Sequence, residues 1–395
     1  MVDTDIQKIN TLLGRGTEDV FVKDDLLKKL SSGKQLRIKF GIDPTGPKIH
    51  IGRAAVLRKL KAFQDLGHQI VLIIGDFTAQ IGDASDKSEK RPMLSKEQVN
   101  ENFKAYKEQI GKILDISKVE FRYNSDWLAT LSFAQICELA EVFTVQQMIS
   151  RRNFKERIEN GNEISLREFM YPLMQGYDSV MVEADVEIGG FDQLFNLKAG
   201  RIMQKHFGKE EQNVLTVQML EGTDGRKMST SWGNVITITD EPNDMFGHIM
   251  SVKDELIPKY FLLATDVVTS EIEIITKAIT DGANPMIYKK QLAKEIVALY
   301  HGADAAQNAY EHFENTFSKG EIPELADMEV AGETQLVEIC LHHGLVSSKG
   351  EFARLIESKS IEHMDSEKIV DDKNAIAQSG TYRIGKKRFI KIKVI

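Results

Sequence analysis

The stretch Gly41-Ile42-Asp43-Pro44-Thr45-Gly46-Pro47-Lys48-Ile49-His50-Ile51-Gly52-Arg53 decides the fold of this 395-residue chain. A short run that alternates apolar and charged residues, 36–40, precedes it. A segment with apolar residues on one helical face, 54–66, follows it, and a continuous apolar run, 69–75, comes next. Strand, turn, helix and strand within about forty residues predict a βαβ unit, the start of a parallel sheet.

The turn places His50, Gly52 and Arg53 at the N-terminus of the predicted helix. Unpaired backbone N–H groups and the helix dipole favour an anion there. Gly52 allows the backbone to approach a ligand closely, and His50 and Arg53 offer donors to phosphate oxygens. An ordinary βα turn with a helix-opening glycine is the alternative explanation of the same residues.

The composition is that of a folded protein, with 42% hydrophobic and 28% charged residues. The length suggests two or three domains. A net charge of −8 excludes a wholly basic nucleic-acid binder, although it leaves room for a local basic surface. The two cysteines, Cys137 and Cys340, are too few for a disulfide framework and too far apart for a metal site, and their helical apolar surroundings predict burial.

The start of the chain predicts helix and no membrane association. Residues 3–30 follow an amphipathic helical pattern. No apolar segment precedes the first charges, and no apolar run approaches the roughly 18 residues of a membrane span. We therefore expect a cytoplasmic protein.

Two further predicted strands end in polar, glycine-bearing turns. Asp83 closes the turn after the strand at 69–75, and the strand at 182–190 ends in two glycines before Asp192 and Gln193 open a helix. The carboxyl ends of parallel strands build the ligand crevice of an open α/β sheet, so we expect these side chains to point toward the pocket of His50. A turn or helix-capping aspartate is the alternative for Asp83.

A third set of polar side chains lies on the predicted helix at 169–180. Tyr171, Gln175 and Asp178 stand at i, i+4 and i+7, which is one helical face. A phenol, an amide and a carboxylate each need a partner if they are buried, so this stripe suits a pocket that holds a zwitterion with a distant hydroxyl. A face toward solvent or toward a domain joint is the alternative.

The loop at 222–234 follows another predicted strand, 213–220, and carries Lys227-Met228-Ser229-Thr230-Ser231. A mobile loop flanked by glycines can bring a cation and hydroxyls to a polyphosphate whose charge redistributes during reaction. A basic surface loop is the alternative, and a solvated surface is the ordinary explanation of the charged run at 86–92.

These motifs resemble those of class I aminoacyl-tRNA synthetases, and their surroundings resemble bacterial tyrosyl-tRNA synthetases over essentially the whole chain. His50-Ile51-Gly52-Arg53 is similar to the His-Ile-Gly-His element, and the loop at 227–231 is similar to the Lys-Met-Ser-Lys-Ser loop. Two positions depart from the family pattern. Arg53 replaces the second histidine, and Thr230 replaces the second lysine.

The resemblance implies a role for each candidate site residue. Tyrosine would be bound by Gly41, Asp43, Asp83, Tyr171, Gln175, Asp178 and Gln193. ATP would be bound by Thr45, His50, Gly52, Asp192, Lys227, Met228, Ser229, Thr230 and Ser231. Catalytic roles would fall to His50, Arg53, Lys227 and Thr230, while Lys87 and Arg91 would face pyrophosphate or tRNA. Asp178 would accept the tyrosine hydroxyl, and Lys39 stands where many members have a tyrosine that touches it.

The implied activity is that of a tyrosyl-tRNA synthetase, an aminoacyl-tRNA ligase. It would join L-tyrosine and ATP into tyrosyl-adenylate and pyrophosphate, and then transfer tyrosine to the 3′-terminal adenosine of tRNA(Tyr). Mg²⁺ would accompany ATP without a dedicated protein site, and the protein would be a homodimer. The alternatives are a tryptophanyl-tRNA synthetase-like enzyme, against which Asp178 counts, and a non-catalytic RNA-binding protein on a synthetase scaffold, which Arg53 and Thr230 leave open.

We expect four parts in the chain. A Rossmann-like parallel-sheet catalytic domain would occupy 1–238, a helical anticodon-side domain 239–318 and a linker 319–334. A small α+β RNA-binding module of the ribosomal protein S-four type would occupy 335–395. This last segment has 11 Lys and Arg against 8 Asp and Glu in an otherwise acidic chain, which suits contact with a phosphate backbone.

Overall fold

The computed structural model describes residues 1–83, 95–229, 232–318, 328–346, 348–366, 368–385 and 388–395. Its contacts divide the chain into two compact units, Met1–Ala306 and Gln307–Ile395. The division falls inside helix α16 (Ala303–Phe313).

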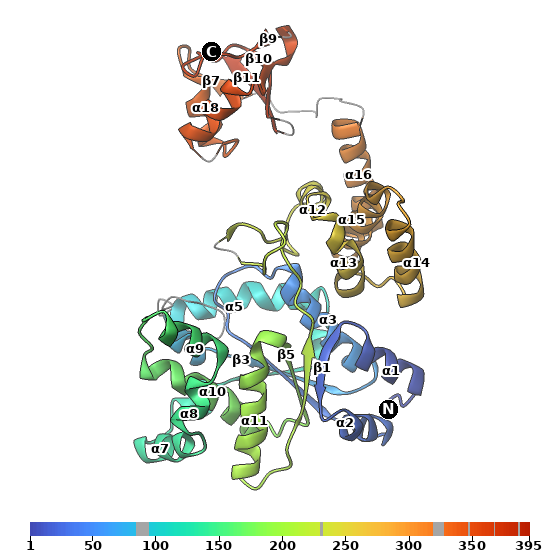
Figure 1. The fold of residues 1–395 in the computed structure, drawn as a ribbon, viewed down its shortest axis with the longest axis vertical. Helices are drawn as coiled ribbons and strands as arrows, with labels where there is room; N and C mark the ends of the chain where they lie inside the picture. The colour runs from blue at the N-terminus through green and yellow to red at the C-terminus, as the bar shows by residue number, and fades with distance from the viewer. Residues whose placement is uncertain (84–94, 230–231, 319–327, 347, 367, 386–387) are drawn as a thin grey trace. The chain divides into compact units, whose positions relative to one another are not determined.

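The first unit is built on a six-stranded sheet with the order β1-β6-β5-β2-β3-β4 (Figure 1). All neighbours pair in parallel except β1, which is antiparallel to β6 at one edge. The strands are β1 (Thr17–Phe21), β2 (Arg37–Ile42), β3 (Gln69–Ile74), β4 (Val119–Tyr123), β5 (Val186–Gly190) and β6 (Asn213–Val217). The predicted Rossmann-like parallel sheet is confirmed.

The predicted βαβ unit is β2, α3 (Ile51–Asp65) and β3, and β2 and β3 pair in register from Arg37 with Gln69 to Ile42 with Ile74. The N-terminal prediction was wrong in part, since β1 interrupts the expected helix between α1 (Ile6–Gly14) and α2 (Lys23–Ser31). Gly16 has a φ of 63°, and a Cβ there would lie 2.5 Å from the side chain of Leu263, so the chain turns away after the helix at a residue whose conformation favours glycine.

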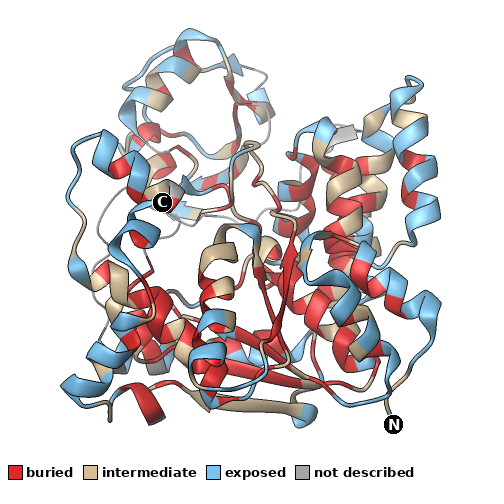
Figure 2. Cartoon of the chain, turned by 60° about the horizontal axis from the view of Figure 1, so that its bottom comes forward, coloured by how far each residue is buried: buried red, intermediate tan, exposed pale blue. Residues whose placement is uncertain are grey.

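Helices cover the sheet and hold its crevice. Helix α3 packs on β3, β5 and β6, and α11 (Leu194–His206) packs on β5 and β6. The other helices of this part are α4 (Thr78–Ile81), α5 (Lys96–Gly111), α6 (Ser125–Leu128), α7 (Phe133–Glu141), α8 (Val145–Ile149), α9 (Arg152–Glu159) and α10 (Leu166–Met181). Val71 and Ile73 of β3 pack with Trp127, Tyr171 and Met174, which brings α10 onto the sheet. The inner strands β2, β3, β5 and β6 are mostly buried, the edge strands β1 and β4 are partly exposed, and the helices expose their outer faces (Figure 2).

The remainder of the first unit is helical. It contains α12 (Pro242–Met250), α13 (Ile257–Ala264), α14 (Thr269–Thr280) and α15 (Pro285–His301). Helix α13 packs on α3, α14 and α15. No helix in the described ranges is both long and apolar enough to cross a membrane.

The second unit contains a five-stranded sheet with the order β7-β11-β10-β8-β9, in which only β7 and β11 are parallel. Its elements are β7 (Met328–Val330), α17 (Leu336–His342), α18 (Lys349–Glu357), β8 (Ile361–His363), β9 (Lys368–Ile369), β10 (Gly380–Ile384) and β11 (Arg388–Val394). Strand β7 falls within the stretch 319–334 that the sequence predicts as a linker. Cys340 is buried in this core as expected, whereas Cys137 is exposed on α7 and the prediction for it was wrong.

Candidate active site

One cavity of about 240 Å³ lies at the carboxyl ends of β2, β3 and β5. Most of the predicted site residues line it: Gly41, Asp43, Thr45, His50, Gly52, Arg53, Asp83, Tyr171, Gln175, Asp178, Asp192, Gln193, Lys227 and Met228. Ser229 is described but does not line it; its backbone N–H donates to Asn234. Lys87, Arg91, Thr230 and Ser231 lie outside the described residues.

His50 is the N-cap of α3. Its Nδ1 accepts the backbone N–H of Arg53 at 3.2 Å, so in the neutral ring the proton is on Nε2. Burial lowers the pKa of His50, the nearby cations Arg53 and Lys227 act in the same direction, and together they bring it to about 3. His50 is therefore a neutral hydrogen-bond donor near pH 7, not a cation.

The helix N-terminus and the lysine loop meet at Gly52. A Cβ at this position would lie 3.1 Å from Nδ1 of His50 and 3.2 Å from Sδ of Met228, so glycine permits their close approach. Arg53 is half-buried, and its guanidinium donates to the hydroxyl of Tyr106 at 2.6 Å. It is thus held at the cavity wall rather than turned into solvent.

Tyr171 is buried on α10 and donates its hydroxyl to Asp43 at 2.8 Å. Burial and the Asp43 carboxylate raise the pKa of Tyr171 well above its usual value, so the phenol keeps its proton. The other oxygen of Asp43 accepts the hydroxyl of Thr78 at 2.8 Å. Gly75 makes room for that carboxylate, because a Cβ there would lie 1.9 Å from Oδ1 of Asp43.

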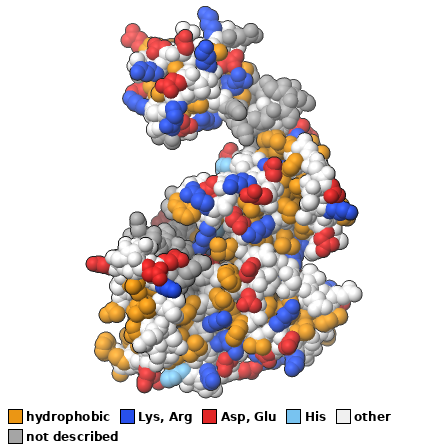
Figure 3. Space-filling view, viewed as in Figure 1, with side chains coloured by type: hydrophobic (Ala, Val, Ile, Leu, Met, Phe, Trp, Pro, Cys, Tyr) orange, Lys and Arg blue, Asp and Glu red, His pale blue; other side chains and the backbone are white. Residues whose placement is uncertain are grey.

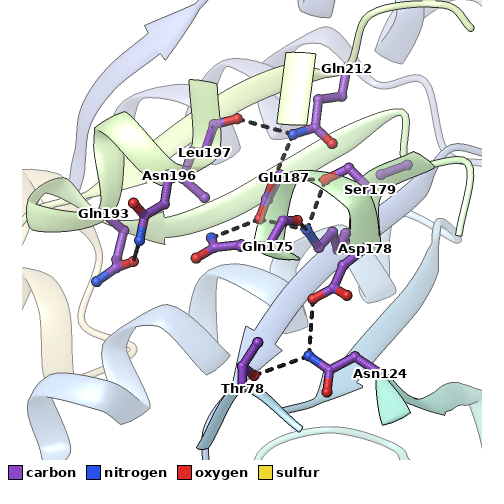
Figure 4. A network of polar contacts seen from close by, with 12 residues as sticks. Thr78, Asn124, Gln175, Asp178, Ser179, Glu187, Gln193, Asn196, Leu197 and Gln212 are labelled. Atoms are coloured by element: carbon purple, nitrogen blue, oxygen red, sulfur yellow. Dashed lines mark hydrogen bonds and ion pairs between the residues drawn. The ribbon is translucent and has the colours of Figure 1, made fainter. Parts of the chain in front are cut away.

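Asp178 stands at the buried side of the cavity, with 3% of its surface exposed. Its two oxygens accept Trp127 Nε1 at 2.8 Å and Asn124 Nδ2 at 3.3 Å. Burial raises the pKa of Asp178 to about 7, while Lys39 and the two donors act in the opposite direction. Asn124 also donates to Thr78, and Figure 4 shows both contacts of Asn124. Because Thr78 donates to Asp43, one polar network joins Asp178 and Asp43.

A second chain of hydrogen bonds fixes Asp83. Gln193 donates to Asp83 at 2.8 Å, Asn196 donates to Gln193 at 2.9 Å, and Arg151 donates to Asn196 at 3.1 Å. An arginine can only donate and a carboxylate can only accept. Arg151 at one end and Asp83 at the other therefore set the orientation of the two amides between them. Figure 4 shows the contact between Gln193 and Asn196.

Lys227 and Asp192 face each other across the mouth of the cavity, 2.8 Å apart. The Lys227 side chain is 36% exposed, in contrast to the carboxylates deeper in the site. This half-exposed pair joins the lysine loop to the turn after β5.

Sequence reasoning missed Thr78, Asn124 and Trp127, which hold the carboxylates of the site. Asn124 directly follows β4, as Asp43 follows β2, so the strand-end rule used for the other residues could have found it. Trp127 lies within α6 and does not directly follow a strand, so the same rule would not have found it. No group of three or more His, Cys, Asp or Glu side chains that could hold a metal ion occurs in the part of the chain that the structure describes.

Residues 31–318 match the family described as tRNA synthetases class I (W and Y). A chain from Thermotoga maritima named tyrosine–tRNA ligase is 45% identical over 386 residues, which cover 96% of both chains. One of the same name from Shewanella oneidensis is 44% identical over 99% of this chain and 100% of its own.

Solved structures share the fold at lower identity. A tyrosyl-tRNA synthetase from Archaeoglobus fulgidus, complexed with L-tyrosine, is 21% identical with a TM-score of 0.63, and the match covers 78% of this chain and 100% of that one. A C-terminally truncated mitochondrial enzyme from Aspergillus nidulans is 22% identical, also with a TM-score of 0.63, over 78% and 94% of the two chains.

Proposed function

We propose that this chain, which belongs to the family of class I tRNA synthetases for tryptophan and tyrosine, acts as a tyrosine–tRNA ligase. The observation that carries the choice of amino acid is Asp178, a buried carboxylate at the closed side of a cavity whose mouth carries cations. Such a carboxylate suits the hydroxyl of a phenol. The names of the relatives that are 44–45% identical over nearly the whole length support the same choice.

The first step would join tyrosine and ATP. The tyrosine carboxylate attacks the α-phosphorus, a P–O bond forms, and the bond to pyrophosphate breaks. No side chain acts as a nucleophile, so the protein contributes position and charge. His50 would donate from Nε2 to a phosphate oxygen, while Arg53 and Lys227 would balance the charge that moves onto the leaving pyrophosphate.

Asp192 would hold the ribose of ATP, and Lys227 would exchange this carboxylate for phosphate when ATP binds. Thr45, Gly52 and Met228 line the same part of the cavity. Mg²⁺ would arrive with ATP on phosphate oxygens, where it neutralises the triphosphate.

Tyrosine would lie with its ammonium toward Asp83, Tyr171 and Gln175 and its hydroxyl on Asp178. Tyr171 donates to Asp43, so the lone pairs of its oxygen remain for an ammonium. Gly41 and Gln193 complete the wall around the substrate.

In the second step a ribose hydroxyl of the terminal adenosine of tRNA(Tyr) attacks the tyrosyl carbonyl and releases AMP. The basic segment 335–395 would bind the tRNA backbone. The helical segment 239–318 would serve the anticodon side. Lys87 and Arg91 would serve the pyrophosphate or tRNA side.

A homodimer is supported by exposed apolar side chains on consecutive helices. Phe133 of α7, Val145 of α8, Ile158 of α9 and Leu166 of α10 are 81%, 59%, 48% and 79% exposed. Figure 3 shows in orange the hydrophobic side chains on one face of the molecule. In a homodimer, a second copy of the chain would cover these side chains. Sedimentation equilibrium tests this, and a monomer would contradict it.

Pyrophosphate exchange into ATP, measured with each of the twenty amino acids, tests the proposed activity. We expect exchange with tyrosine and none above background with phenylalanine or tryptophan. Exchange with tryptophan instead would establish the tryptophanyl alternative, and no exchange with any amino acid would establish a non-catalytic protein.

A further inference from the structure

Lys39 and Glu187 form an ion pair that is completely shielded from solvent beside the candidate site. The side chains are both 0% exposed, and Nζ of Lys39 lies 2.9 Å from Oε1 of Glu187. They stand opposite each other in the parallel pairing of β2 and β5. Neither residue lines the cavity.

Every charged atom of this pair has a partner. Lys39 also donates to the backbone oxygen of Gln175 and to the hydroxyl of Ser179, both at 2.8 Å. The other oxygen of Glu187 accepts from Ser179 at 3.0 Å and from Gln212. A buried ion pair is tolerated when its remaining hydrogen-bonding capacity is filled, as it is here.

The contact that matters for the site is the one from Gln175. Its Nε2 donates to Oε1 of Glu187 at 3.1 Å, and Gln175 lines the cavity. A carboxylate only accepts, so it fixes which end of the amide it meets. The amide oxygen of Gln175 therefore faces the other way (Figure 4), and within the described residues no protein group donates to it.

We propose that Glu187 and Lys39 are positioning residues that orient the amide of Gln175, so that the substrate ammonium meets an oxygen and not an NH₂ group. Glu187 acts on the amide directly. Lys39 compensates the buried charge of Glu187 and ties α10 to β2 at the backbone of Gln175. This inference rests on the proposed function, because it takes the amino group of tyrosine as the ligand of Gln175.

The proposal accounts for a lysine that lies too deep to touch substrate. In the described structure Lys39 makes no contact with the cavity, so it cannot replace a hydroxyl-binding side chain. Lys39 acts on Gln175 indirectly, through its ion pair with Glu187.

The test compares L-tyrosine with 4-hydroxyphenyllactate, in which a hydroxyl replaces the ammonium, by calorimetric binding to the full chain. An ammonium can only donate, whereas a hydroxyl can also accept from a reversed amide. Glu187→Gln allows the amide of Gln175 to turn over. We expect tyrosine affinity to fall about 10- to 100-fold and hydroxyphenyllactate affinity to change by less than about threefold.

Two further variants separate orientation from a loss of structure. Ser179→Ala removes a partner of the ion pair but leaves Glu187 facing Gln175, so the affinity ratio of the two ligands should stay at the wild-type value. Glu187→Gln leaves Lys39 buried without its counter-charge and lowers stability; the double variant Lys39→Met with Glu187→Gln removes both charges. It should regain part of the melting temperature and keep the altered ratio.

An unchanged ratio in a folded Glu187→Gln protein, or in the double variant, would overturn the proposal. An equal loss for both ligands would likewise assign the pair to stability alone. If the wild-type chain activates no tyrosine in pyrophosphate exchange, the proposed function fails instead, and the two failures are thus distinguishable.

Discussion

Replacing Asp178 with asparagine should change which amino acid the protein activates. Each oxygen of Asp178 already accepts one donor, from Trp127 at 2.8 Å and from Asn124 at 3.3 Å. In Asp178→Asn the oxygen will stay on Trp127, because that contact is shorter, and the new NH₂ group will face the NH₂ group of Asn124. The tyrosine hydroxyl then loses a charged acceptor.

The size of the effect follows from the loss of one hydrogen bond to a charged group, about 1.5–3 kcal/mol, or roughly 10- to 150-fold in kcat/KM for tyrosine. Phenylalanine has no hydroxyl and leaves the carboxylate short of a partner in the wild type, so its kcat/KM should not fall. We therefore expect the ratio of tyrosine to phenylalanine in pyrophosphate exchange to drop by about 10-fold or more. The KM for ATP is the control, and a ratio within threefold of wild type would refute the role of Asp178.

The same variant gives a pH signature in stability. Burial raises the pKa of Asp178 to about 7, above its ordinary value of 3.8. Between about pH 4 and pH 7 the folded state therefore holds this proton, whereas the unfolded state has lost it. The contribution of Asp178 to the free energy of unfolding is full below about pH 4 and is lost as the pH rises toward 7. Asp178→Asn should thus be less destabilising, relative to wild type, at pH 8 than at pH 5, and an equal melting-temperature difference at both would contradict this.

Three other changes test separate parts of the structure. Gly75→Ala would put a Cβ 1.9 Å from Oδ1 of Asp43 and should slow exchange by about tenfold or more, with little loss of secondary structure by circular dichroism; full activity would show that Asp43 need not stay in place. Ending the chain after Ser318 should preserve tyrosine-dependent exchange but abolish most tRNA charging, with a shallower salt dependence of tRNA binding, and full charging would exclude residues 319–395 from tRNA binding. Arg53→His should slow adenylate formation and adding Thr230→Lys should restore much of the rate, whereas additive effects would show that the two departures do not compensate.

The parts of the fold that the sequence predicted are those with local causes. The βαβ unit follows from an apolar periodicity within one stretch, and the three strand ends follow from the rule that parallel strands finish at one edge. Edge strand β1 was missed because its only local cue is Gly16, just after the end of α1, and its partner β6 is about two hundred residues away.

The sequence predicted individual site residues, but not the hydrogen bonds and ion pairs that join them. Asp43, Asp83 and Asp178 each stand in a motif that is visible in the sequence. The side chains that donate hydrogen bonds to these carboxylates come from other segments of the chain. Lys39 and Glu187 show why: each is a buried charged side chain within a strand, and only the register between β2 and β5 makes them partners. Pairing across a sheet is a property of the tertiary fold, so one sequence read in order cannot supply it.

The charged groups that line the cavity favour one orientation of a bound amino acid. The carboxylates Asp43, Asp83 and Asp178 lie on the buried side, each held by donors before any ligand arrives. The cations Arg53 and Lys227 lie toward the mouth, and His50 between them stays neutral because burial and their charge lower its pKa to about 3. In the proposed binding mode, a tyrosine zwitterion would place its ammonium near Asp83 and its carboxylate toward Arg53 and Lys227, where phosphate would be bound. In that binding mode the attacking oxygen would reach ATP without a catalytic base, because the carboxylate is already ionised and would need only to be positioned.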